Sequence, residues 1–202
     1  LHNLGTILRN QGDYAGAAAC YEEALARRRR LLPPTHPDIA WSLNNLAAFH
    51  MWKDDYARAE PLLREARERL RARLGADSPE VAQVTYNLAQ SSLLQHRLAE
   101  AEALLREALD ALRRAHGDES RHVAGCLHAL GDCLTDQGRY EEAQPLFDAA
   151  IATSRRLLGL EHPHVAWALD DLALCCQSRG RAAEAESLWA EAARIFEQAR
   201  LR

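Results

Sequence analysis

Few residues in the chain have the types and the spacing that metal binding or catalysis needs. His122 and Cys126 stand four residues apart, and Cys175 and Cys176 follow later, a set of soft ligands that could hold a metal ion. Cysteines inside helices are far more often small core residues, so we favour that interpretation and predict no metal site. The sequence has no Ser-His-Asp order, no glycine-rich phosphate loop and no HExxH motif. We therefore predict a protein that is not an enzyme, has no catalytic residues and needs no cofactor.

Charge and cysteine usage narrow the range of partners and compartments. The formal net charge is −4 and the isoelectric point is about 6.2, which gives no reason to expect nucleic acid as a partner. No run approaches the roughly 18 apolar residues of a membrane span, so we expect no membrane partner. The five cysteines form no CxxC pair, which favours reduced thiols and a cytoplasmic protein. The chain starts at Leu1 without a signal-like segment, and we interpret it as a fragment of a longer protein.

The elements that must position any functional residue are helices. Among 202 residues there are 38 Ala and 32 Leu, both strong helix formers. The 4 Val, 4 Ile and 5 Thr are too few to build a sheet of any size. Because 48% of the residues are hydrophobic and 27% are charged, the chain can bury a core. The composition therefore predicts an all-α protein.

One short motif recurs with a constant spacing of 42 residues. The segment Leu-His-Asn-Leu-Gly at residue 1 has counterparts that start at residues 43, 85, 127 and 169. No insertion interrupts the series, and an unbroken period of this length indicates a solenoid. We predict a single solenoid domain over residues 1–202, with repeats at 1–42, 43–84, 85–126, 127–168 and 169–202.

Within each period, apolar residues follow helical spacing twice, so each repeat is expected to be a pair of helices. Gly75 ends one helix as a C-cap, and Ser78 with Pro79 opens the next as N-cap and N1 residue. His36 and His162 precede prolines in the same way and are expected to cap. First helices are expected near 37–52, 79–95, 120–137 and 163–178, and second helices near 14–31, 55–74, 98–116, 140–158 and 182–199. The predicted fold is a right-handed α-solenoid of five helix-turn-helix repeats.

Small and large residues hold fixed places in each repeat, which identifies the repeat type. Alanine recurs at 17, 59, 101, 143 and 185, and large residues recur four positions later, at Tyr21, Leu63, Leu105, Phe147 and Trp189. This order resembles the tetratricopeptide repeat. The long period and the linker at residues 158–166 are similar to those of the kinesin-light-chain type. The resemblance implies a scaffold or adaptor module that binds a protein or peptide in a concave groove lined by the first helix of each repeat.

Carried over by register, the resemblance predicts a set of groove-facing residues. They are Asn3, Arg9, Asn10, Trp41, Asn44, Asn45, Trp52, Tyr86, Asn87, Gln90, His128, Asp132, Asp136, Trp167, Asp170 and Asp171. Exposed aromatic and amide side chains suit peptide recognition, and they would be costly in a dry core.

Asparagine holds the same place in three successive repeats, at residues 3, 45 and 87. A carboxamide offers a donor and an acceptor together, so it can pair with both polar groups of a peptide bond. The series therefore resembles an asparagine ladder that holds a peptide backbone. The alternative is that each amide bonds only its neighbouring helix.

The charges of the predicted groove indicate a ligand with a basic residue. Arg9 is the one certain cation of the set, whereas four aspartates come from adjacent first helices of the later repeats. We expect an aromatic or apolar anchor of the ligand against Trp41, Trp52 and Tyr86, and a basic residue near Asp132 and Asp171. In the alternative interpretation, these aspartates only solvate an idle surface, or pair with His128 and Arg179.

A second function class stays open. The array could be a self-assembly or intramolecular regulatory segment that packs on itself or on its own effector domain. The final helix carries an apolar face with Trp189 and Phe196, and solenoid ends usually need a polar cap. We therefore expect end-to-end self-association through these two residues, or contact with a further repeat.

Overall fold

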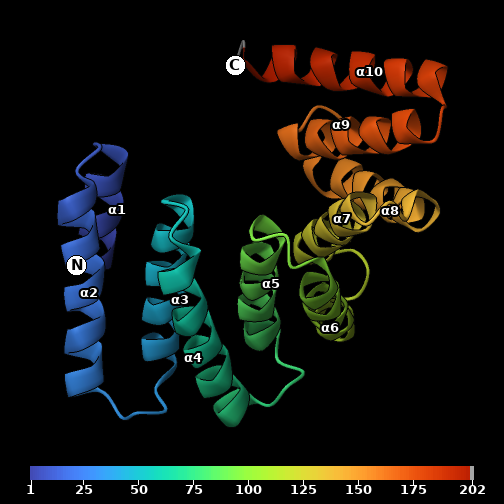
Figure 1. The fold of residues 1–202 in the computed structure, drawn as a ribbon. Helices are drawn as coiled ribbons and strands as arrows, with labels where there is room; N and C mark the ends of the chain where they lie inside the picture. The colour runs from blue at the N-terminus through green and yellow to red at the C-terminus, as the bar shows by residue number, and fades with distance from the viewer. Residues whose placement is uncertain (201–202) are drawn as a thin grey trace. The chain divides into compact units, whose positions relative to one another are not determined.

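Ten α-helices follow one another in the computed structural model, which describes residues 1–200 except for the side chain of His2 (Figure 1). No strand occurs within these residues. The first helices of the repeats are α1 (His2–Asn10), α3 (Pro37–Trp52), α5 (Pro79–Leu94), α7 (Arg121–Asp136) and α9 (Pro163–Ser178). The second helices are α2 (Tyr14–Leu31), α4 (Tyr56–Leu74), α6 (Leu98–His116), α8 (Tyr140–Leu158) and α10 (Ala182–Arg200). The predicted all-α solenoid fold is confirmed.

The helix ends lie within a residue or two of the predicted ones because local chemistry sets them. Ser78 accepts the backbone N–H of Val81 at 3.2 Å and caps α5. The His36 and His162 rings accept backbone N–H groups two residues later, so the predicted capping role is confirmed. Gly75 ends α4 with φ of 85°, a conformation that favours glycine.

The chain divides into two compact units, residues 1–95 with α1 to α5 and the part from His96 onward with α6 to α10. The division falls in the turn between α5 and α6, inside the third predicted repeat. Within each unit, helices that are adjacent in sequence pack against each other. The single domain over 1–202 stays a prediction, and its last two residues lie outside the described part.

The core of each unit follows the predicted order of small and large residues. The five recurrent alanines at 17, 59, 101, 143 and 185 are fully buried. Gly131 of α7 faces the ring of buried Phe147, so closely that an added Cβ would lie 2.7 Å from the ring. In the two middle repeats with alanine at this place, Ala47 and Ala89, the second helix offers the smaller Leu63 and Leu105, whereas Ala173 in the last repeat stands with the half-buried Trp189. In the first four repeats the first and second helices therefore complement each other in volume.

Four cysteines belong to this core, as predicted. Cys126, Cys133, Cys175 and Cys176 are buried, and Cys20 is half-buried. All five are free thiols. Burial raises the pKa of Cys126 to about 12, so its thiol is protonated at neutral pH, as expected of a core residue.

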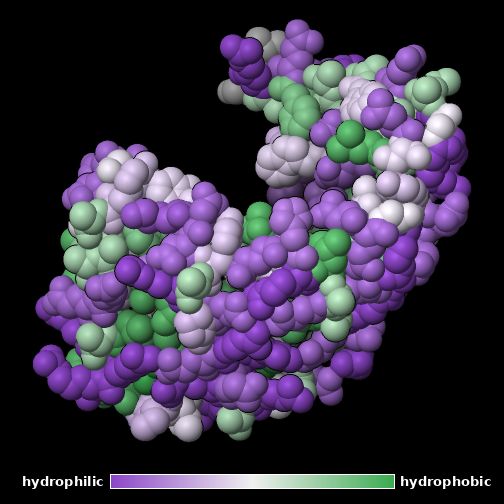
Figure 2. All heavy atoms as spheres, viewed as in Figure 1, coloured by the Kyte–Doolittle hydropathy of each residue, from purple (hydrophilic) through white to green (hydrophobic). Residues whose placement is uncertain are grey.

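The surface is mainly polar. Hydrophilic residues cover most of the face seen in Figure 2, with hydrophobic ones in smaller groups. Within residues 1–200, no helix combines the length and the apolar character that crossing a membrane requires.

Candidate functional site

The first unit brings two of the predicted amides together. Asn87 on α5 donates its side-chain N–H to the side-chain oxygen of Asn44 on α3, with the two atoms 2.7 Å apart. Asn44 is only 7% exposed, so this bond satisfies a buried polar group. This bond joins Asn87 to a neighbouring first helix, as expected if the amides link helices to each other. A carboxamide has further donor and acceptor capacity, so contact with a ligand stays possible in chemical terms. Asn45 is half-buried and Asn3 is exposed.

The predicted aromatic residues of the first unit do not share one environment. Trp52, at the end of α3, is 52% exposed, and its ring lies 4.7 Å from that of Tyr14 on α2, centroid to centroid. Phe49 lies beneath it, at 6.5 Å between centroids. Trp41 and Tyr86 are half-buried. Tyr14 was absent from the predicted groove because it belongs to a second helix.

The remaining predicted residues of this unit are polar and at least partly exposed. Arg9 is half-buried and donates to the side-chain oxygen of exposed Asn10 at 3.2 Å. Gln90 is half-buried on α5. These residues remain a predicted binding surface.

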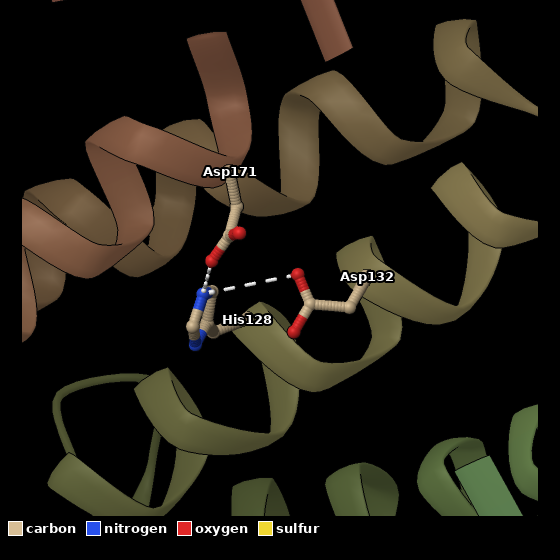
Figure 3. Close-up of side chains that lie close together, drawn as sticks. All are labelled: His128, Asp132 and Asp171. Atoms are coloured by element: carbon tan, nitrogen blue, oxygen red, sulfur yellow. Dashed lines mark hydrogen bonds and ion pairs between the residues drawn. The ribbon is translucent and has the colours of Figure 1, made fainter. Parts of the chain in front are cut away.

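The second unit gathers His128, Asp132 and Asp171 (Figure 3). His128 and Asp132 lie one turn apart on α7, and Asp171 reaches them from α9. The Nε2 atom of His128 lies 2.6 Å from an Asp171 carboxylate oxygen and 3.8 Å from an Asp132 oxygen. All three side chains are partly exposed, and the contact of His128 with Asp171 is one that the alternative interpretation names.

The polar pairs of the two units occupy equivalent places in their repeats. Asn44 and Asn87 are 43 residues apart, as are His128 and Asp171. A shift of two repeats, or 84 residues, maps the first pair onto the second. The contact therefore recurs between first helices of successive repeats, with neutral amides in one unit and charged groups in the other.

Burial and charge shift the titration of the cluster in the second unit. Burial lowers the pKa of His128, but the hydrogen bond to Asp171 and the two carboxylate charges outweigh it, so the net pKa lies above its ordinary value. Burial raises the pKa of Asp132 to about 7, with His128 opposing the rise and the charges of Asp171 and Asp136 adding to it. The arrangement attracts a proton or another small cation.

The other predicted residues of this unit do not take part in the contacts among His128, Asp132 and Asp171. Asp136 and Asp170 are exposed. Trp167 is 49% exposed and lies edge-on against His164, with 5.0 Å between ring centroids. Arg179 contacts Gln144 and Glu141. Arg179 therefore bonds residues of α8 in place of the suggested aspartates.

Comparison with known families identifies the family of the chain. Models of the tetratricopeptide repeat match residues 1–38, 38–114 and 122–198, most of the chain. The chain is a tetratricopeptide-repeat protein. Repeats of this family generally form non-catalytic scaffolds for protein interactions. No curated protein sequence matches this tetratricopeptide-repeat protein.

Solved structures of similar fold include kinesin-light-chain-like proteins. One is a Podosopora anserina protein described as a kinesin light chain with nearly identical repeats, with 22% identity, a TM-score of 0.83, and 100% of this chain and 95% of that chain covered. Another is BtubC (BKLC) from P. vanneervenii, with 24% identity, a TM-score of 0.86, and 98% and 78% coverage. A third is a Rap protein complexed with Competence and Sporulation Factor, with 18% identity, a TM-score of 0.75, and 97% and 53% coverage. At these identities the likeness supports the fold alone.

Proposed function

We propose that this tetratricopeptide-repeat protein is a cytoplasmic scaffold or adaptor, not an enzyme, and that its first helices bind an extended segment of a partner protein. The observation that carries the proposal is the pair of exposed tryptophans on first helices, Trp52 and Trp167, at 52% and 49% exposure. A large exposed aromatic side chain is the residue type that dominates binding energy at protein interfaces. The free thiols of all five cysteines support a reducing compartment.

The fold itself supports a binding role. The Rap neighbour was solved in a complex with Competence and Sporulation Factor, so a protein of this fold holds a partner. In this chain, polar residues that suit a peptide backbone accompany the tryptophans on the first helices, among them Asn45 and Gln90.

The ligand is proposed to carry an aromatic or apolar anchor for Trp41, Trp52 and Tyr86 and a basic residue for the acidic face of the second unit. The Nε2 atom of His128 already occupies Asp171, at 2.6 Å from a carboxylate oxygen. The exposed carboxylates of Asp136 and Asp170 are therefore the more open partners for a basic side chain.

A peptide selected from a random library tests the proposal. Trp52→Ala and Trp167→Ala should each weaken its binding about thirtyfold, the equivalent of about 2 kcal/mol for an interface hot spot. The matched control is Leu160→Ala, because Leu160 is 67% exposed but lies in the linker between α8 and α9. Equal losses for all three variants, or failure to select any peptide, would remove the proposal.

Charge is tested with the same peptide. Replacing Asp136 and Asp170 together by asparagine should weaken a basic peptide and flatten the dependence of its affinity on salt concentration. An unchanged salt dependence, or a preference of the original protein for acidic peptides, contradicts the charge assignment.

A second candidate function is self-association, favoured by the apolar face of α10. Phe196 is 37% exposed and Trp189 is half-buried on this face. Sedimentation velocity over a wide concentration range distinguishes the two functions. Reversible association that Phe196→Ser abolishes, without peptide binding, favours self-assembly, whereas a monomer that binds peptides favours the scaffold.

A further inference from the structure

The three side chains of the α7–α9 cluster present one imidazole nitrogen and two carboxylate oxygens to a common space (Figure 3). Their potential ligand atoms all lie within 4.8 Å of one another. In a tetrahedral site with bonds of about 2.0–2.2 Å, ligand atoms lie roughly 3.3 Å apart. The observed separations from His128 Nε2, 2.6 Å to Asp171 and 3.8 Å to Asp132, lie on either side of that value.

Register within the chain indicates that this cluster is more than a link between two helices. The equivalent places in the first unit hold Asn44, Ala48 and Asn87. There, one hydrogen bond between neutral amides links α3 to α5, and alanine occupies the third place. Two carboxylates and an imidazole at the same place in the second unit concentrate charge that helix packing does not require.

A metal ion suits the cluster better than a basic side chain of a ligand. An arginine or lysine placed between Asp132 and Asp171 would have to compete with His128, whose Nε2 already lies 2.6 Å from an Asp171 oxygen. A metal ion instead takes the neutral ring as a ligand and neutralises both carboxylates.

We propose that His128, Asp132 and Asp171 form a binding site for a divalent first-row transition-metal ion such as Zn²⁺. Mixed nitrogen and oxygen ligands favour such an ion, whereas Mg²⁺ and Ca²⁺ favour oxygen alone. Three protein ligands leave coordination positions open to water or to a side chain of a partner. The bound ion joins first helices of two repeats. The spacing of the sequence pointed only to the set with His122, Cys126, Cys175 and Cys176, because Asp171 lies 43 residues from His128 and the two meet only through helix packing.

Isothermal titration of the untagged chain with ZnCl₂ alone tests the site. One ion is expected to bind per chain, and His128→Gln, Asp132→Asn and Asp171→Asn should each weaken binding at least about tenfold. Asp110→Asn is the matched control, because this exposed carboxylate lies on α6 of the same unit, outside the cluster, and it should change affinity less than twofold. Circular dichroism confirms that each variant keeps its helices.

A second readout keeps the test decisive if a variant loses its structure. Co²⁺ bound to the unaltered chain should give the absorption of a low-symmetry nitrogen and oxygen site without thiolate charge transfer. No binding of Zn²⁺ at millimolar concentration overturns the proposal. So does unchanged binding in His128→Gln and Asp171→Asn, which would place the ion elsewhere, for example on the stacked rings of His162 and His164.

Discussion

Replacement by alanine should have different effects on stability at two glycines of α7. An added Cβ at Gly131 would lie 2.7, 2.8 and 2.9 Å from three ring atoms of Phe147, which is fully buried and has little room to move. At Gly125, one and a half turns earlier in the helix, an added Cβ meets nothing within 4 Å. Both substitutions to alanine gain about 0.8–1.0 kcal/mol of helix propensity, and only Gly131→Ala adds an overpacking cost of about 1–3 kcal/mol.

The difference between the two variants isolates the contact with Phe147. Gly125→Ala should raise the free energy of unfolding, and Gly131→Ala should be less stable than Gly125→Ala by about 1–3 kcal/mol. Urea unfolding followed by far-ultraviolet circular dichroism measures both variants, and they share α7, so they report on the same unfolding unit.

A double-mutant cycle completes the test. In a Phe147→Leu background, which reproduces the alanine and leucine pairing of Ala47 with Leu63, Gly131→Ala should cost nothing or stabilise. Equal stability of Gly125→Ala and Gly131→Ala, or an undiminished cost of Gly131→Ala beside Leu at position 147, would refute the proposed complementarity of volume.

Two further predictions concern polar groups of the first unit. Asn87→Ala should lower the free energy of unfolding by about 1–2 kcal/mol, because it leaves the 7%-exposed Asn44 without its donor, whereas Asn45→Ala, measured beside it by urea unfolding, should cost under about 0.5 kcal/mol. Equal effects of the two would contradict the role of the Asn44 bond. Burial lowers the pKa of His50 below 6.5 in the folded chain, against an opposing effect of Asp55, so the unfolded chain binds more protons between the lowered pKa and 6.5. The free energy of unfolding should therefore fall as the pH drops through that window, and it should fall less steeply in His50→Gln. Identical pH profiles of urea unfolding for the unaltered protein and the variant would refute this.

The helices and their ends could be predicted because their signals are local. Ser78 and Pro79 open α5 through a cap and a fixed φ, and Gly75 ends α4 through a positive φ. The 42-residue period then indicated that every repeat has the same two helices. These features need no knowledge of how the helices pack.

The partners of the candidate residues could not be predicted, because they depend on the register between helices far apart in sequence. Asn87 finds Asn44, and Asp171 finds His128, only through the packing of successive first helices. A comparison of each first-helix residue with the one 43 positions later would have suggested both pairs. No sequence signal placed Tyr14 against Trp52, since a second-helix residue had no assigned role in the groove.

The central claim is that first helices contact the partner. Photo-crosslinking of the selected peptide to the unaltered chain, with the attachment sites located by mass spectrometry, tests it most directly. The account predicts attachments on α1, α3, α5, α7 or α9, including the exposed rings of Trp52 or Trp167. Attachments confined to α2, α4, α6, α8 and α10 would contradict it.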